Sequence, residues 1–502
     1  MGEKKLEMKY KRNWIKYGLI LVVTVLLCQN FLQMHYSSDT YVLLDLGYIN
    51  YPQEYFLLDG RLISAIVCYA AGIINIPYNI YIIGMDIIGV IFISIAIYVL
   101  SDVLKKILNK QDYLSEIIIV LGTFVLILNQ FTLEYLLFPE SAVMCLAVLL
   151  IVLAVKIMIQ DTKKKYIKIF ILLLLAGISY QGTISIFPVL AILICIIRQM
   201  VEKREYKIAE KENFLEIFKI ILITISVLIL VFGIVEVCKN LLNSEQNRNL
   251  KVETIEDFEE RIIITLGYFD EIWNKTMYMI PEGLNNIVII MTVVLLVGMK
   301  VKKEIIMQYL VFMLIIALSC IIPMFLFDTG PCGRVNNPAA MVLGISLLIL
   351  LTKVWKCKSE RIINIMYVFI IIVFSVNSIY LIRNTTEHIA ANRVENNNGK
   401  TIKAMVDEYE KSTGNKITKL GYRRDLYPNY YSIGIKKIGS LTERKFACNW
   451  SATEIVEFYL ERDLELVPYS IELFKENFHK NYDEFREEQI TFKENTMYMV
   501  IY

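Results

Sequence analysis

The chain has 502 residues, of which 56% are hydrophobic, and its formal net charge is only +2. Its mean hydropathy of +0.51 is too high for a water-soluble globular protein, and its near-neutral charge gives no support to nucleic-acid binding. The nine Cys include no CxxC pair and the chain has only three His, so we expect no metal site and no cofactor.

Unbroken apolar runs, such as residues 220–235 and 367–376, recur along the chain. Runs of about 20 apolar residues match the hydrocarbon core of a bilayer, where only a helix satisfies its own backbone hydrogen bonds. The sequence therefore predicts an all-α polytopic membrane protein. Its expected spans are residues 17–34, 80–104, 113–131, 140–160, 166–180, 184–198, 217–238, 284–299, 306–326, 338–353 and 362–382.

The positive-inside rule orients these eleven spans. Residues 1–16 are basic and are placed in the cytoplasm, so the loop at 36–61 falls outside. The short apolar stretch 62–76 is predicted not to span, because counting it would put every later basic loop outside. The pair 166–180 and 184–198 is short, and it could be a re-entrant hairpin without altering the orientation.

Beyond Arg383 the composition becomes polar and charged. Residues 401–412 and 452–462 have helical periodicity, 416–422 is typical of a strand, and the C-terminal residues predict a hairpin that turns at 493–495. We therefore expect a membrane domain at 1–383 and a small extracytoplasmic α/β domain at 384–502. The protein is predicted to lie in the plasma membrane, in contact with the lipid bilayer.

Ionisable residues beside a bilayer are costly, which makes them functional candidates. They gather in the outer loops, and they are Asp39, Asp45, Asp59, Arg61, Glu134, Glu140 and Arg334, joined by Tyr180 and Gln181. This composition suits sugar transfer from a polyprenyl phosphate. A carboxylate takes the proton of the acceptor hydroxyl, and guanidinium or amide groups stabilise the phosphate that leaves.

Asp39 is the first candidate for the catalytic base because it follows the first span closely, and Asp45 is the second. Each candidate also has a structural interpretation. Asp39 could be a solvated residue or the cap of a following helix, and Glu140, after Pro139, could start the fourth span.

Three further candidates also have structural alternatives. Asp59 and Arg61 could belong to a turn before the helix at 62–76, and Arg334 could extend its side chain to the interface. Asp86, within a span, is expected to pair with one of the cations or to make a helix–helix contact.

Four stretches resemble bacterial glucosyltransferases of the Gtr type II family. They are Asp39 with DGRLIS (59–64), FTLEYLLFPESAVMCLAVLL (131–150), SYQGTISIFPVLAILI (179–194) and CGRVNNPAAMVLG (332–344). The resemblance implies a GT-C-like helical bundle and a metal-independent, inverting transfer from polyprenyl-phosphate glucose to a surface glycan acceptor.

By position, the resemblance makes Asp39 the base, Glu140 its acidic partner, and Gln181 and Arg334 substrate or phosphate contacts. The family often has paired acidic residues in the first loop, whereas Asp39 stands between Ser38 and Thr40. Asp45 therefore stays open as the base.

Two other functions remain open at this stage. A flippase or transporter of lipid-linked glycans would place its ionisable residues near the bilayer midplane, often within internal repeats. No repeat is evident, and the polar residues lie on one side, which disfavours transport. A surface-polysaccharide polymerase or ligase would share the outer-face site.

Overall fold

The computed structural model describes residues 2–160, 162–201, 206–242, 255–326, 330–357, 359–424, 434–448, 450–470, 472–473 and 486–501. The helices are α1 (Gly2–Cys28), α2 (Ser38–Tyr51), α3 (Leu62–Ile74), α4 (Tyr78–Leu108), α5 (Tyr113–Ile127), α6 (Ser141–Met158), α7 (Lys165–Ser179), α8 (Ile186–Val201), α9 (Tyr206–Leu241), α10 (Ile255–Trp273), α11 (Leu284–Gly298), α12 (Lys303–Leu326), α13 (Asn337–Val354), α14 (Glu360–Thr413) and α15 (Ala452–Leu460). The strands are β1 (Lys419–Arg424), β2 (Glu465–Val467), β3 (Ile490–Lys493) and β4 (Thr496–Ile501).

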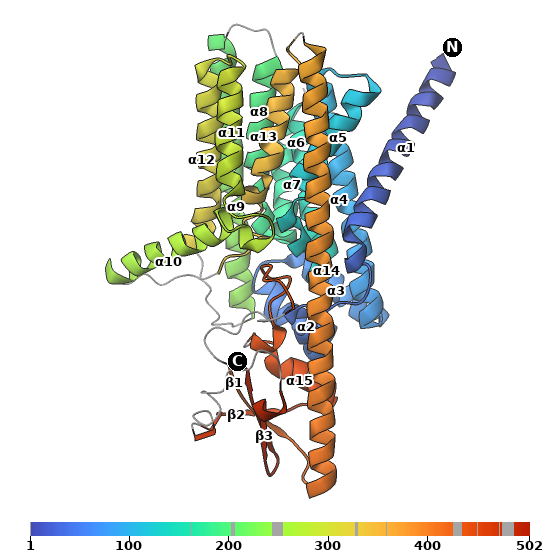
Figure 1. Ribbon diagram of the computed structural model, residues 1–502, viewed down its shortest axis with the longest axis vertical. Coiled ribbons are helices and arrows are strands. Elements are labelled where there is room, and N and C mark those ends of the chain that lie inside the picture. The colour runs from blue at the N-terminus through green and yellow to red at the C-terminus, as the bar shows by residue number, and fades with distance from the viewer. Residues whose placement is uncertain are drawn as a thin grey trace.

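Most helices stand side by side in a bundle, and the sheet lies beyond one end of it (Figure 1). Within the described ranges, eight helices are long and apolar enough to cross a membrane. The number is nine if α5 and the 3-10 segment η3 (Gln130–Leu136), which meet at a 64° bend, form one broken span. The chain is thus a helical membrane protein, as predicted.

The two remaining predicted spans form helices of about the predicted length. The stretches 166–180 and 284–299 form α7 and α11, each of 15 residues. That length falls short of the roughly 20 residues that a ~30 Å hydrocarbon core requires. Helix α3, with 13 residues, fits the prediction that 62–76 does not span.

The outer faces of several bundle helices are apolar and exposed. Ile229 of α9, Ile290 of α11 and Leu314 of α12 are each more than half exposed. A continuous apolar surface of this kind is unfavourable in water, and contact with lipid tails removes that cost. Inside the bundle, α4, α6, α8 and α13 bury most of their side chains.

Helix α14 runs for 54 residues, along the bundle and on to the sheet (Figure 1). The change in composition at residue 383 falls inside this continuous helix. Residues 414–501, which we call the head, form a four-stranded sheet in the order β2-β1-β4-β3. Strand β1 is parallel to both neighbours, and β3 and β4 form the predicted antiparallel hairpin.

The segment 36–61 is largely helical and joins the head to the bundle. Helix α2 begins at a capping box in which Ser37 accepts a hydrogen bond from the Thr40 amide at 3.2 Å. The cap residue is therefore Ser37 and not Asp39. Tyr41 of α2 belongs to the apolar core of the head, whereas its neighbours Val42 and Leu43 pack with α3 and α4.

The contact between α14 and α15 generates a prediction about Gly399. A Cβ at this position would lie 2.0 Å from the ring of Tyr459, whose hydroxyl donates to Asn396 at 3.0 Å. Gly399→Ala should therefore destabilise the docking of the head by about 1–3 kcal/mol, although Ala favours a helix. Limited proteolysis of the head measures this.

Gly267→Ala is the matched control, because a Cβ at helical Gly267 meets no atom within 4 Å. This variant should resist the protease at least as well as the wild type. Equal cleavage of the two variants would contradict the packing described for α14 and α15.

Candidate active site

Arg61 lies between two carboxylates at the start of α3. Its Nη1 is 2.8 Å from Glu140 Oε1, and its Nη2 is 2.8 Å from Asp59 Oδ2. The guanidinium also lies over the ring of Tyr180, 5.0 Å from the centroid. A planar guanidinium suits this arrangement, because it donates along several directions and stacks through its face.

The turn before Arg61 requires a glycine. Gly60 has φ +71, and a Cβ there would lie 2.6 Å from a methyl group of Val235 in α9. Glycine alone adopts this conformation without strain and leaves this space. The turn closes through the Arg61 amide, which donates to the Phe56 carbonyl at 2.8 Å. It thereby directs the side chain of Arg61 towards α6.

Arg334 is fixed in the loop before α13 by its backbone and its side chain. Its amide donates to Glu134 Oε2 at 3.0 Å, and its carbonyl accepts from the Tyr135 hydroxyl at 2.9 Å. Its Nε donates to the Tyr180 hydroxyl at 3.1 Å, and its Nη1 is 4.0 Å from Glu134 Oε2. Tyr180 therefore contacts both arginines and brings them together.

Glu134 is the carboxylate that holds the Arg334 loop, a role that the sequence did not reveal. It lies in η3 and is fully buried. Gly333 allows the close approach, since a Cβ there would come within 3.1 Å of the Glu134 carboxyl. The sequence signal for this role was the position of Glu134 among apolar residues, where an ionised carboxylate is energetically costly.

Asp39 and Asp45 have different surroundings. Asp39 is half-buried in the first turn of α2, and its carboxylate acts electrostatically on Glu140 and Arg334. Asp45 is largely exposed, and the partial loss of solvent around its carboxyl, together with the nearby Asp463 of the head, raises its pKa. Asp39 thus lies within electrostatic reach of Glu140 and Arg334, whereas Asp45 lies near the head.

We define the charged cluster as Asp39, Asp59, Arg61, Glu134, Glu140 and Arg334. Its members come from α2, the turn before α3, η3, the start of α6 and the loop before α13, and all of them lie at or near helix ends. Of the residues proposed from sequence, only Asp45 stands apart. Gln181 joins the cluster by donating to the Asp59 carbonyl at 2.8 Å.

The cluster retains hydrogen-bonding capacity. Glu134 Oε1, Glu140 Oε2, Arg61 Nε and Gln181 Oε1 are buried and have no hydrogen-bond partner among the described residues. Buried polar atoms are nearly always paired, so four such atoms together suit a ligand rich in hydroxyl or phosphate oxygens. In the described residues, no group of three His, Cys, Asp or Glu side chains is arranged to hold a metal ion.

Burial governs the electrostatics of the cluster. Burial raises the pKa of the Glu140 carboxyl to about 7. The positive charges of Arg61 and Arg334 lower this pKa, whereas the negative charge of Asp39 raises it. Burial also raises the pKa of Tyr180 to about 12. For Arg334, burial lowers the pKa, but the surrounding groups outweigh it and the pKa rises above its ordinary value.

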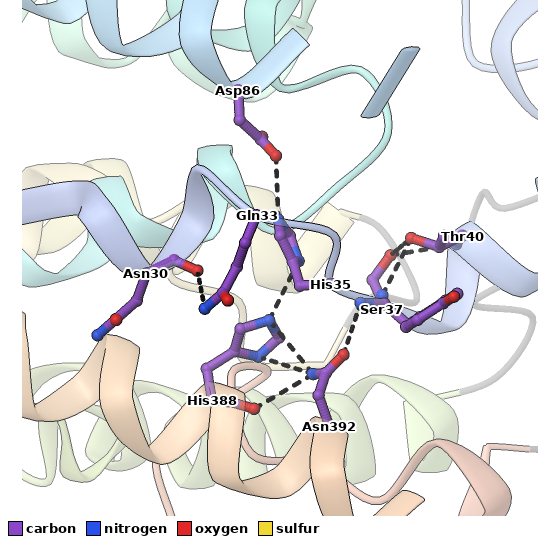
Figure 2. Close-up of polar contacts among 9 residues, drawn as sticks. Asn30, Gln33, His35, Ser37, Thr40, Asp86, His388 and Asn392 are labelled. Atoms are coloured by element: carbon purple, nitrogen blue, oxygen red, sulfur yellow. Dashed lines mark hydrogen bonds and ion pairs between the residues drawn. The ribbon is translucent and has the colours of Figure 1, made fainter. Parts of the chain in front are cut away.

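A second polar network links the segment between α1 and α2 with α4 and α14 (Figure 2). His35 Nε2 is 3.1 Å from Asp86 Oδ2, and His35 Nδ1 is 3.1 Å from His388 Nε2. All three side chains are buried. Asp86 thus pairs with a histidine, which corrects the expectation that it pairs with one of the outer-loop cations.

The network also reaches the head and α2. His388 Nδ1 lies 2.7 Å from the carbonyl of Leu441, which can only accept, so Nδ1 carries a proton. A neutral His388 then accepts from His35 Nδ1–H, which leaves one proton shared between His35 Nε2 and Asp86. Asn392 accepts from the Tyr36 amide at 2.6 Å and so fixes the chain just before Asp39 (Figure 2).

The helices and the charged cluster define the class of protein. It is a helical membrane protein in which buried carboxylates and guanidinium groups meet at helix ends. Residues 37–332 match the family described as Glucosyl transferase GtrII, and the chain belongs to this family. The match confirms the resemblance found in the sequence and indicates a membrane glucosyltransferase. No curated protein matches the chain in sequence.

The raised pKa of Glu140 generates a prediction about stability. Folding raises this pKa from 4.5 to about 7. The folded state therefore holds the proton more tightly, and its stability falls as the pH rises from about 4.5 to 7, by on the order of 3 kcal/mol. Glu140→Gln cannot titrate and should flatten this dependence. Thermal unfolding at pH 5 and pH 8 in detergent measures it.

Glu461→Gln is the control for that experiment, because Glu461 is an exposed carboxylate of the head. This variant should keep the wild-type difference between the two pH values. An unchanged difference in Glu140→Gln would show that Glu140 does not titrate in this range.

Proposed function

We propose that this protein transfers glucose from a polyprenyl-phosphate donor to a cell-surface polysaccharide or other glycan acceptor, with inversion at the anomeric carbon. The reaction takes place on the outer face of the plasma membrane, and Asp39 is the general base. The observation that supports this most is the meeting of Arg61 and Arg334 on Tyr180, beside Asp39 and Glu140.

The two arginines suit the phosphate of the donor. In transfer, the bond between the anomeric carbon and the phosphate oxygen breaks, and its electron pair stays on the phosphate. Guanidinium groups stabilise this developing charge, and they do so more strongly where water is excluded. Arg61 Nε is buried and has no hydrogen-bond partner among the described residues, so it is available to a phosphate oxygen.

The carboxylates suit the acceptor. Its hydroxyl oxygen forms the new bond to the anomeric carbon, and its proton passes to Asp39. Glu140 holds Arg61 in place through the 2.8 Å contact and balances its charge. No step requires Asp45, whose neighbours are acidic residues of the head.

The position of the cluster favours a transferase over a transporter. Transporters bind their substrates near the bilayer midplane. The charged cluster instead lies at helix ends, on the side of the bundle where the head docks. A polymerase or ligase would use the same position. An assay with radiolabelled polyprenyl-phosphate glucose distinguishes a glucosyltransferase from a polymerase or ligase by the product that carries the label.

Asp39→Asn should lower kcat by about 10²–10⁴-fold, because Asn keeps the size of the side chain but cannot take a proton. Asp45→Asn should stay close to the wild type and serves as the matched control. Both are measured by transfer of radiolabel from polyprenyl-phosphate glucose. Full activity in Asp39→Asn, or a loss confined to Asp45→Asn, would contradict this assignment of the base.

Arg334→Lys should lower kcat by about 10²–10³-fold, since Lys keeps the charge but cannot contact Tyr180 and a phosphate together. The same radiolabel assay measures it. Arg462→Lys, in an ion pair of the head with Glu410, is the control and should retain activity. Comparable rates in the two variants would remove Arg334 from the phosphate site.

A further inference from the structure

A cavity of about 310 Å³ lies between the ends of α4, α6 and α8. Its charged lining residues are Lys106 of α4, Lys156 of α6 and Arg198 of α8, each in the last turn of its helix. The three helices pack against one another within the bundle. Three positive side chains from three separate helices therefore line the same hollow.

The cavity lies at the end of the bundle opposite to the charged cluster. Helix α6 begins next to Glu140 and α8 begins shortly after Gln181, and both helices run away from the cluster (Figure 1). Their 18 and 16 residues place their last turns about 25 Å away along the helix axis. The cavity is therefore a separate place in the molecule from the site described above.

The residues that line the cavity leave its positive charge largely unbalanced. Among the described lining residues, none is acidic. Lys106 pairs with Asp102 at 2.7 Å, but Asp102 lies outside the lining and more than half of the Lys106 side chain is exposed. Lys156 is half-buried and forms no hydrogen bond or ion pair with any described residue. Its ammonium group is therefore available to an anion in the cavity.

The rest of the lining is aliphatic, apart from the amide of Gln160. It consists of Val103, Ile107 and Ile159. A hollow lined by cations and aliphatic side chains suits an anion that carries an apolar part. Phosphate esters have this character, since Lys and Arg bind phosphate oxygens strongly, and basic pockets between membrane helices bind the phosphates of lipids.

Two general rules account for the presence of these cations but not for their common cavity. Positive residues are enriched at one end of membrane spans, and they interact favourably with the C-terminal end of a helix. Both rules apply equally to Lys353, in the last turn of α13 at the same end of the bundle, which does not line the cavity. The convergence on one hollow is the feature that needs a ligand.

We propose that this cavity binds a phosphate group, which the three cations hold while the aliphatic residues contact the apolar part of the same ligand. The phosphate comes from a membrane lipid or from a soluble phosphate ester, and the aliphatic lining favours the lipid. This site is distinct from the charged cluster, and the proposal does not depend on the proposed function.

The test titrates full-length protein in a neutral detergent with three probes. Phosphatidylglycerol presents a lipid phosphate with a net negative charge, and inorganic phosphate presents the anion alone. Phosphatidylcholine, whose headgroup has no net charge, gives the background of nonspecific lipid binding. Native mass spectrometry gives the dissociation constants of the lipids, and isothermal titration calorimetry gives that of inorganic phosphate.

Lys156→Gln should raise the dissociation constant of phosphatidylglycerol by about tenfold or more, the effect of removing one charged hydrogen bond. Arg198→Gln should act in the same direction. Because Lys156 has no partner among the described residues, Lys156→Gln should also unfold at the wild-type temperature. Lys353→Gln is the matched control, since it removes another half-buried Lys from the last turn of a bundle helix, and it should bind like the wild type.

The two sources of phosphate give different results. A loss of phosphatidylglycerol binding in Lys156→Gln, without measurable binding of inorganic phosphate, supports a lipid. Binding of inorganic phosphate that weakens in the same variant supports a soluble ester. If neither probe binds above background, if neither loses affinity in Lys156→Gln and Arg198→Gln, or if Lys353→Gln loses as much, the proposal is overturned.

Discussion

Two guanidinium groups, each only partly exposed, contact the same tyrosine, Tyr180, and each is paired with carboxylates. Arg61 depends on the nearby Asp59 and on Glu140, and Arg334 depends on Glu134. A buried charge without such a partner costs several kcal/mol, so these pairs determine how the helix ends can meet. The turn at Gly60, the bend before η3 and the loop before α13 all serve this one requirement. The same pairs leave four buried polar atoms of the cluster and Gln181 without a hydrogen-bond partner among the described residues, and these atoms are available to a ligand.

The head is joined to this site by more than its covalent link. Tyr41 of α2 fills the core of the head, and Ile438 of the head fills the core of the bundle, so each part buries a residue of the other. The His35–His388 contact ties the segment between α1 and α2 to α14. A displacement of the head would therefore disturb α2 and Asp39 directly. The geometry of the charged cluster and the docking of the head depend on the same contacts.

Much of this arrangement could be predicted from the sequence. Apolar runs predicted the helices, alternation around residues 493–495 predicted the hairpin, and the charges of the predicted outer loops gave Arg61, Glu140 and Arg334 as candidate site residues. The pairing itself could not be predicted, because spacing along the chain does not say that Glu134, and not Glu140, holds Arg334. His35 and His388 are 353 positions apart and follow no local pattern. The composition changes at residue 383, yet the backbone continues through this point as a single helix. Composition indicates whether a segment lies in lipid or in water, and a helix can pass from one to the other without ending.

The length of α14 exceeds what a bilayer core requires. Its 54 residues extend about 80 Å, of which a bilayer core takes up ~30 Å. The remainder runs on past the bundle as a stiff rod against which the head packs (Figure 1). Under the function proposed above, an acceptor glycan would therefore be modified only near the bundle end at which the head docks, and its more distant segments would stay out of reach.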